Sequence, residues 1–169
     1  MTDVMAKAQW RRMREEDVAR ANEVGNAIHV DFFEEEAVFQ NRFALYPAGC
    51  FVLTAGDEIV GYGISHPWRL DSIPTLNTVI EKLPDNASTY YIHDIAILPA
   101  YRSGGNAAHV VRLMAGQAEH DGFATMALVA VNGSRGYWER HGFVVRSLPA
   151  LEEKLQTYSD DALYMVRVG

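Results

Sequence analysis

Residues 95–107 read Ile95-Ala96-Ile97-Leu98-Pro99-Ala100-Tyr101-Arg102-Ser103-Gly104-Gly105-Asn106-Ala107, and this stretch decides the fold. It closes a segment rich in aromatic and β-branched residues, Tyr90 to Leu98, which is typical of a β-strand. From Ala107 onward, apolar residues recur at helical spacing until Gly122 supplies a stop. The glycines therefore fall where a strand ends and a helix begins. Free N–H groups at the start of a helix attract an anion, and glycines let a phosphate approach them closely.

The glycine pair alone also fits an ordinary turn, so the neighbouring residues must separate the alternatives. The segment lacks the Lys-Ser/Thr ending of an ATP-binding loop and the three spaced glycines of a dinucleotide-binding loop. Downstream, Met126 to Val131 is an uninterrupted apolar run, which is typical of a strand covered on both faces. Strand, helix and buried strand in this order predict a right-handed crossover and a parallel pair of strands.

The other segments predict one domain spanning residues 1–169, because two domains would each have a small core. Amphipathic spacing predicts one helix from Glu16 to Val30 and a second from Glu35 to Leu45. The remaining expected elements are a strand at Gln9 to Met13, a hairpin of Phe51 to Ala55 with Glu58 to Ser65, a short helix at Ser134 to His141, and strands at Phe143 to Arg146 and Ala162 to Val168. The segment from Arg69 to Ser88 is interpreted as an insertion.

The composition limits the classes of partner. The net charge of -7 argues against nucleic acid, whose binders gain affinity from clustered Lys and Arg. The single cysteine, Cys50, cannot form an internal disulfide, and we expect its side chain to be buried as a small apolar group. A protein without disulfides is expected in the reducing cytoplasm. No unbroken apolar stretch is long enough to span a bilayer, so neither export nor membrane insertion is expected.

Two motifs carry a resemblance to the GNAT superfamily of N-acetyltransferases. Residues 95–107 resemble its first signature, which is a strand ending in an apolar-Ala-apolar step, a proline, and then Arg-x-x-Gly-x-Gly/Ala. Arg102, Gly105 and Ala107 stand at the fixed positions of that signature. Residues 137–143, Tyr-Trp-Glu-Arg-His-Gly-Phe, resemble the second signature, an aromatic pair, two charged residues and Gly-Phe. The two motifs occur in the family's order and at about its spacing, which makes the signal specific. Together with the predicted helix-helix-hairpin start, the resemblance covers nearly the whole chain.

The resemblance implies an α/β fold with a central, mostly antiparallel sheet flanked by about four helices. In that sheet the strands 90–98 and 126–131 form a parallel pair that splays apart, and acetyl-CoA, the co-substrate, lies in the V between them. The pantetheine arm pairs with the backbone of Ile95, Ala96 and Ile97, and an N–H near Ile97 polarises the thioester carbonyl. The implied pyrophosphate site consists of Arg102, Ser103, Gly104, Gly105, Asn106, Ala107 and Ala108.

His93 is the candidate general base. A histidine titrates near pH ~6.5, which suits deprotonation of an amine at neutral pH. Strand alternation predicts that His93 shares a face with Tyr91 and Ile95, while Asp94 points to the other face. The position is similar to one in serotonin N-acetyltransferases, the arylalkylamine-acetylating members of the superfamily, which also carry a histidine there. The alternative is a hydrogen-bonded strand histidine with no chemical role.

Trp138 stands where the family often has a tyrosine that protonates the departing thiolate. An indole N–H donates a hydrogen bond but no proton at useful pH, so the usual acid is lost. Tyr137 is expected to point about a quarter-turn away from that position. We expect Trp138 to pack against the pantetheine arm, with simple core packing as the alternative. Asn132 is a candidate cofactor ligand, and a strand-terminating turn is its alternative role.

The function predicted from this resemblance is transfer of an acetyl group from acetyl-CoA to a primary amine of a small molecule. Candidates for the acceptor pocket are Phe32, Phe33, Trp68 and Tyr91, whereas Phe39 and Phe43 fit the core equally well. The other histidines lack metal-ligand spacing, so no metal is expected. A protein N-terminal or lysine acetyltransferase and a non-catalytic acyl-CoA-binding module stay open as alternatives, as does a homodimer.

Overall fold

The apolar runs of the chain form a single sheet in a computed structural model that describes residues 7–169. Within those residues the sheet has seven strands in the order β1-β2-β3-β4-β5-β7-β6. The strands are β1 (Ala8–Arg12), β2 (Cys50–Ala55), β3 (Glu58–Trp68), β4 (Thr89–Ile97), β5 (Thr125–Ala130), β6 (Val144–Val145) and β7 (Leu163–Val168). The helices are α1 (Val18–Ile28), α2 (Glu36–Leu45), α3 (Asn106–His120), α4 (Arg135–Glu139) and α5 (Glu152–Gln156). The predicted hairpin and crossover are confirmed, while α5 was not predicted.

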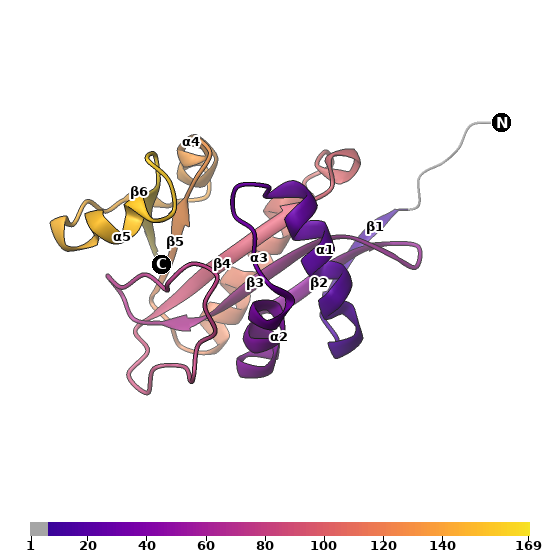
Figure 1. Cartoon of the computed structure of the whole chain (residues 1–169), viewed down its shortest axis with the longest axis horizontal. Coiled ribbons are helices and arrows are strands. Elements are labelled where there is room, and N and C mark those ends of the chain that lie inside the picture. Colours follow the sequence, from indigo (N-terminus) through magenta and orange to yellow (C-terminus); the bar gives the residue numbers. More distant parts are fainter. Residues whose placement is uncertain (1–6) are drawn as a thin grey trace.

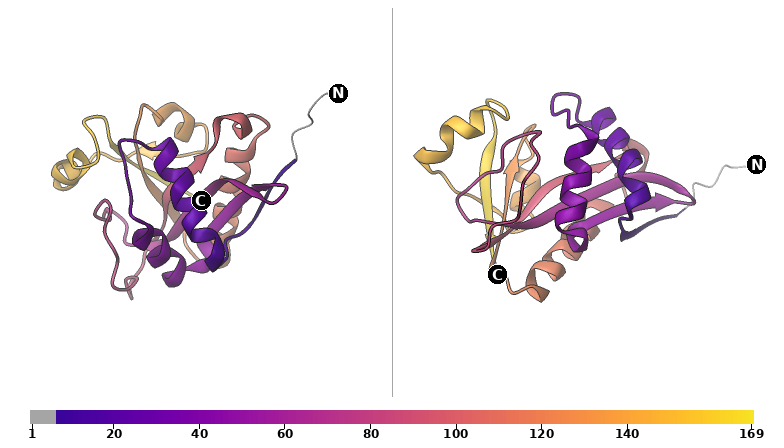
Figure 2. Two further views of the ribbon diagram at one scale, coloured as in Figure 1. Left: turned by 45° about the vertical axis from the view of Figure 1, so that its right-hand side comes forward. Right: turned by 60° about the horizontal axis from the view of Figure 1, so that its bottom comes forward.

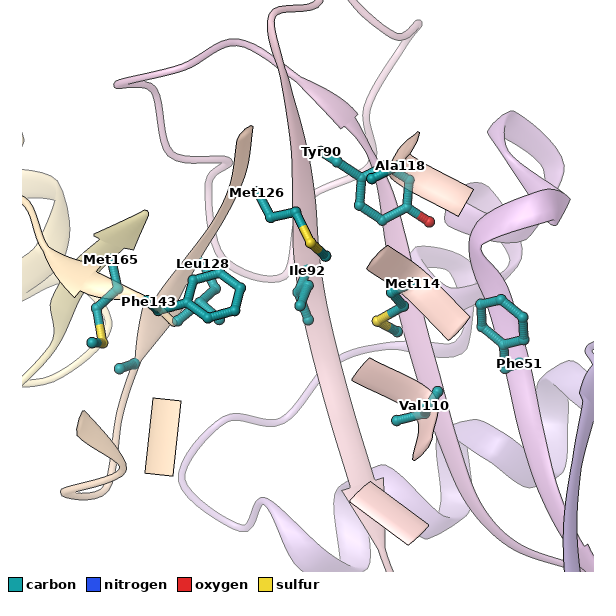
Figure 3. Packing of buried hydrophobic residues seen from close by; sticks show 11 residues of the cluster. Phe51, Tyr90, Ile92, Val110, Met114, Ala118, Met126, Leu128, Phe143 and Met165 are labelled. Atoms are coloured by element: carbon teal, nitrogen blue, oxygen red, sulfur yellow. The ribbon is translucent and has the colours of Figure 1, made fainter. Parts of the chain in front are cut away.

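Helices cover both faces of the sheet (Figures 1 and 2). The apolar side of α3, including Val110 and Met114, packs on Tyr90 and Ile92 of β4 (Figure 3). Residues of α1 and α2 pack on the opposite face, against a cluster centred on Tyr62. Each of these helices has one apolar side, whereas each central strand has two apolar faces. The layering removes the apolar side of the helices and both faces of the central strands from water.

The β4 and β5 strands pair only at one end. They are parallel and pair at Tyr90 with Met126 and at Tyr91 with Ala127, whereas every other neighbouring pair is antiparallel. Beyond Tyr91 the two strands diverge, and the edge of β4 that faces β5 loses its partner. The predicted mixed sheet with a splayed parallel pair is therefore confirmed.

A β-bulge in β4 reverses one prediction about His93. Asp94 lies opposite Ile64 of β3, but the next residue of β3, Ser65, lies opposite Ile92, so His93 is the extra residue. A bulge shifts the alternation of side chains by one position. His93 therefore points to the same side of the sheet as Asp94 and Tyr91, and the predicted sharing of a face with Ile95 is wrong.

The segment between β3 and β4 is tied down at both sides. Asn41 and Arg42 of α2 donate hydrogen bonds to the carbonyl oxygens of Ile80 and Thr78, at 2.8 and 3.0 Å. On the other side, the Tyr158 hydroxyl donates to the carbonyl of Pro74 at 2.5 Å. The insertion is thus held between α2 and the segment that follows α5.

Two further observations concern the predictions from composition. Cys50 is a free and fully buried cysteine, as expected, and its burial raises the pKa of the thiol to about 12. In residues 7–169, none of the helices combines the length and the apolar character that a membrane crossing requires.

Candidate functional site

A cavity of about 350 Å³ occupies the V between β4 and β5. The predicted site residues that line it are Phe32, His93, Ile95, Ala96, Ile97, Arg102, Ala107, Asn132 and Trp138. The remaining loop residues, Ser103, Gly104, Gly105, Asn106 and Ala108, do not line the cavity and lie beside it at the start of α3. The two motifs of the sequence therefore meet across one cavity, one on β4 and α3 and the other on α4.

The backbone of β4 presents free hydrogen-bonding groups to this cavity. Leu98 N–H donates to the Val60 carbonyl of β3, so Ile97 and Ile95, at the alternate positions, direct their N–H and C=O groups away from β3. Arg102 Nε donates to the Ile97 carbonyl at 2.8 Å. The Ile97 and Ile95 N–H groups are then available to an extended ligand that lies along the strand, whereas the Ile95 carbonyl lies beside the His29 imidazole.

The loop before α3 presents a set of free amides. Gly104 and Gly105 have φ of 86° and 78°, a conformation that glycine adopts without steric cost. The first amide of α3 with a backbone partner is that of His109, which donates to the Gly105 carbonyl at 2.9 Å. Within residues 7–169, the N–H groups of 103–108 have no hydrogen-bond acceptor, so the turn and the helix dipole together have the geometry that suits an anion.

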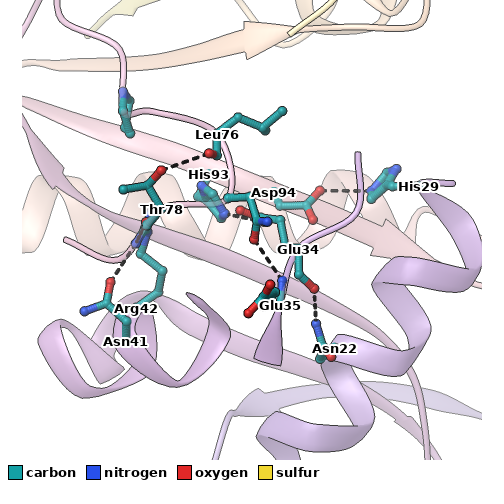
Figure 4. A network of polar contacts seen from close by, with 12 residues as sticks. Asn22, His29, Glu34, Glu35, Asn41, Arg42, Leu76, Thr78, His93 and Asp94 are labelled. Atoms are coloured by element: carbon teal, nitrogen blue, oxygen red, sulfur yellow. Dashed lines mark hydrogen bonds and ion pairs between the residues drawn. The ribbon is translucent and has the colours of Figure 1, made fainter. Parts of the chain in front are cut away.

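His93 is held by a carboxylate that the sequence analysis did not identify. His93 Nε2 lies 2.8 Å from Glu34 Oε1, and both side chains are less than a tenth exposed (Figure 4). Glu34 is placed by its own backbone, because Asn22 and Asn26 of α1 donate to its carbonyl at 2.7 and 3.0 Å. An Nε2–H that donates to a carboxylate leaves the lone pair on Nδ1, so Nδ1 is the nitrogen able to accept a proton.

Asp94 forms a second polar cluster on the same side of the sheet. Its carboxylate accepts a hydrogen bond from the Tyr62 hydroxyl and lies 2.9 Å from His29 Nε2, close enough for an ion pair although the angle is poor for a hydrogen bond. Burial opposes ionisation of Asp94, yet the contacts with His29 and Tyr62 outweigh it and lower the pKa. Burial likewise disfavours the charged form of His29, but Asp94 raises the pKa of that histidine.

The aromatic pair of α4 contributes both members to the cavity wall. The Tyr137 hydroxyl is buried without a hydrogen-bond partner in the described structure, and burial raises the pKa of this tyrosine. The prediction that Tyr137 points away from the site is therefore wrong. Trp138 also lines the cavity and packs edge-on against Phe143, with ring centroids 5.5 Å apart, so it serves the core as well.

Three segments distant in sequence also contribute to the lining of the cavity. Phe32 comes from the α1–α2 loop, Leu76 from the insertion and Tyr158 from the segment after α5. The other predicted pocket residues, Phe33, Trp68 and Tyr91, do not line the cavity. Phe33 is 57% exposed and Tyr91 only 2% exposed, because the loop turns one outward and the sheet covers the other. Trp68 packs beside Tyr91 in the cluster of β5 and β7.

Two smaller predictions concern Asn132 and metals. Asn132 has φ of 55° and follows β5, so it forms the turn that ends the strand and also lines the cavity. In the part of the chain that the structure describes, no three His, Cys, Asp or Glu side chains are grouped as metal ligands would be.

Comparisons with known proteins agree on the fold. The loading GNATL domain of CurA from Lyngbya majuscula superposes with a TM-score of 0.79 at 14% identity, covering 96% of this chain and 98% of that domain. A chain of the NatC complex bound to Gag peptide and CoA gives 0.71 at 15% identity, covering 96% and 99%. N-acetylglutamate synthase from Neisseria gonorrhoeae, complexed with coenzyme A and N-acetyl-glutamate, gives 0.70 at 13% identity, covering 96% of this chain and 35% of that one.

Sequence comparison assigns the family directly. No curated protein matches the sequence. A family model described as Acetyltransferase (GNAT) family matches residues 10–143, which run from within β1 to beyond α4 and include both sequence motifs. With most of the chain matched, the protein belongs to the Acetyltransferase (GNAT) family.

Proposed function

We propose that this protein transfers the acetyl group of acetyl-CoA to a primary amine of a small molecule. One observation carries the proposal: the free edge of β4, the His93–Glu34 pair and Tyr137 line one cavity. The edge suits an extended pantetheine arm, the histidine suits an amine that must lose a proton, and the hydroxyl suits a departing thiolate.

The backbone supports binding of the CoA ester at two points. The free amides of residues 103–108 suit the pyrophosphate, since they combine the helix dipole with close approach at Gly104 and Gly105. The Ile95 N–H suits the amide-containing pantetheine arm, and the Ile97 N–H then polarises the thioester carbonyl. No side chain is needed for either contact.

His93 acts as the general base in this mechanism. Glu34 fixes its tautomer, so Nδ1 takes a proton from the acceptor ammonium. The neutral amine attacks the thioester carbonyl, and the resulting tetrahedral species expels the thiolate of CoA. Tyr137 donates its hydroxyl proton to that thiolate and is reprotonated by the second proton, which the nitrogen loses as it becomes an amide. His93 then releases its proton to solvent. The raised pKa of Tyr137 keeps the hydroxyl protonated until the thiolate forms.

The insertion and the segment after α5 favour a small acceptor, because both contribute to the cavity lining. Leu76 and Tyr158 line the cavity together with His93, and the Tyr158 hydroxyl donates a hydrogen bond to the Pro74 carbonyl of the insertion. A peptide acceptor needs an open groove in which the chain can continue past the reacting amine. A peptide acceptor is the competing candidate, because a chain of the NatC complex has this fold and that complex is bound to a Gag peptide.

Acetyl-CoA with panels of small amines and of peptides separates these candidates. The expected result is release of free thiol and an N-acetylated product with small primary amines, and no product with peptides. Turnover of peptides alone would move the assignment to protein acetylation. CoA binding with no turnover of any acceptor would contradict catalysis and favour a non-catalytic acyl-CoA-binding role.

A further inference from the structure

Three arginines gather around His141 without counter-ions. Arg112 lies on α3, Arg140 follows α4 and Arg167 lies on β7. Within residues 7–169, none of the three forms an ion pair or a side-chain hydrogen bond. The chain has a net charge of -7, so an unneutralised positive cluster on it is unexpected. Like charges held together without partners are destabilising unless an anion binds among them.

Arg167 lies on the α3 side of the sheet, and Arg140 lies beside Tyr137 of α4. Arg167 lies directly opposite Met126 in the β5–β7 ladder, so their side chains share a face, and Met126 packs in the cluster that contains α3 residues. Arg167 Cδ lies 3.6 Å from the point where a Cβ on Gly142 would stand. Arg140 Cζ lies 5.9 Å from the ring centroid of Tyr137, which lines the cavity. Both guanidinium groups therefore border α4.

The helical position of Arg112 directs it toward α4 as well. Gln117, on the same helix, accepts a hydrogen bond from Arg12 of β1 at 2.9 Å, which marks the side of α3 that faces β1. Arg112 precedes Gln117 by five residues, which at 3.6 residues per turn is one full turn and a further rotation of about 140°. The Arg112 side chain therefore lies on the side of α3 that faces away from β1. The charge distribution agrees, because burial and then Arg167, Arg112 and Arg140 lower the pKa of His141.

We propose that Arg112, Arg140 and Arg167 bind the 3′-phosphate of CoA. This inference rests on the proposed use of acetyl-CoA. Ala108 is the last residue of the free-amide loop, and Arg112 lies four residues on, one turn or ~6 Å away on the same side of α3. The ribose phosphate of CoA is a dianion attached a few bonds from the pyrophosphate, so a cluster one turn along the helix is within its reach.

Other groups near the cluster do not neutralise it. Glu139 is the adjacent carboxylate in sequence, and it already pairs with Arg135 at 3.5 Å. A guanidinium group matches the geometry of a phosphate better than an ammonium does, because its planar N–H fork binds two oxygens at once. Arginines from three separate elements are thus suited to surround one phosphate.

The test compares CoA with 3′-dephospho-CoA, which differs by this phosphate alone. Calorimetry at ionic strength of about 20 mM should give CoA a Kd at least about tenfold lower, and the difference should shrink at about 200 mM salt. Equal Kd values for the two ligands would overturn the inference while leaving the proposed function intact. Failure of both ligands to bind would contradict the proposed use of CoA itself.

Two variants assign the effect to the cluster. Arg112→Gln and Arg140→Gln change exposed side chains, so both proteins are expected to fold. Each should raise the Kd for CoA about fivefold and leave that for 3′-dephospho-CoA unchanged, since unit charges 4 Å apart in water interact by about 1 kcal/mol. The control is Arg20→Gln, an exposed arginine on α1 that should not alter the ratio. An equal loss of both ligands in Arg112→Gln would contradict a phosphate-specific role.

Discussion

Replacing Gly105 by valine tests the anion site and separates ligand binding from folding. Gly105 precedes α3 with φ of 78°, and a Cβ there would meet no atom within 4 Å. The cost to stability is therefore that of the left-handed backbone, about 1–2 kcal/mol for an L-residue. For a domain of this size that corresponds to a fall in Tm of about 2–8 °C.

Gly122 provides the matched control at the other end of α3. Its φ is 83°, and a Cβ there also meets nothing within 4 Å, so Gly122→Val should have the same effect on Tm. Only Gly105→Val places carbons over the free amides of residues 103–108. Loss of one hydrogen bond to a charged phosphate costs about 1.5–3 kcal/mol, so the Kd for CoA should rise about 10- to 100-fold in that variant alone. Calorimetry and thermal unfolding measure both quantities, and an equal Kd for CoA in the two variants would refute the loop assignment.

Three further predictions concern the cavity. His93→Ala should lower kcat by about 10²–10⁴-fold and cost more than Trp138→Phe, because only the histidine moves a proton; the reverse order in steady-state assays would remove the mechanism. Tyr137→Phe should lower single-turnover thiol release with little change in the Kd for CoA, and an unchanged rate would exclude its hydroxyl from the reaction. Asp94 raises the pKa of His29 despite burial, so the stabilisation by this pair is complete below pH ~6.5 and lost at higher pH. Urea unfolding of wild type and His29→Gln should accordingly converge from about pH 6 to pH 9, and a constant difference would contradict the pairing.

Regular periodicity predicted most elements of the fold. The apolar spacing from Ala107 to Ala118 and the run Met126 to Val131 are long enough to identify α3 and β5 without tertiary information. The helix α5 was missed because it has five residues and only Leu155 of them is buried. Short elements such as this depend on the core they cover, here the cluster on β5 and β7, and not on their own pattern.

The side of the site assigned to the cofactor was more predictable than the side that we propose for the acceptor. Backbone groups form the loop and the β4 edge, and a local motif identifies them because glycines and a strand are features of contiguous sequence. The acceptor side joins Glu34, Leu76 and Tyr158, which come from three connections between elements. Glu34 and His93 are 59 residues apart, and no spacing rule relates them. Only packing of the α1–α2 loop against the sheet brings them together.

The bulge at His93 explains why the chemistry required the structure. Alternation along a regular strand would place His93 with Ile95 against α3, where Val110 and Met114 fill the interior. One extra residue rotates it to the face of the α1–α2 loop, where Glu34 and the cavity lie. No residue type in Tyr91-Ile92-His93-Asp94 signals a bulge, since all four are compatible with a regular strand. The same irregularity places His93 and Asp94 on one side, so adjacent residues form two carboxylate–histidine pairs at one cavity.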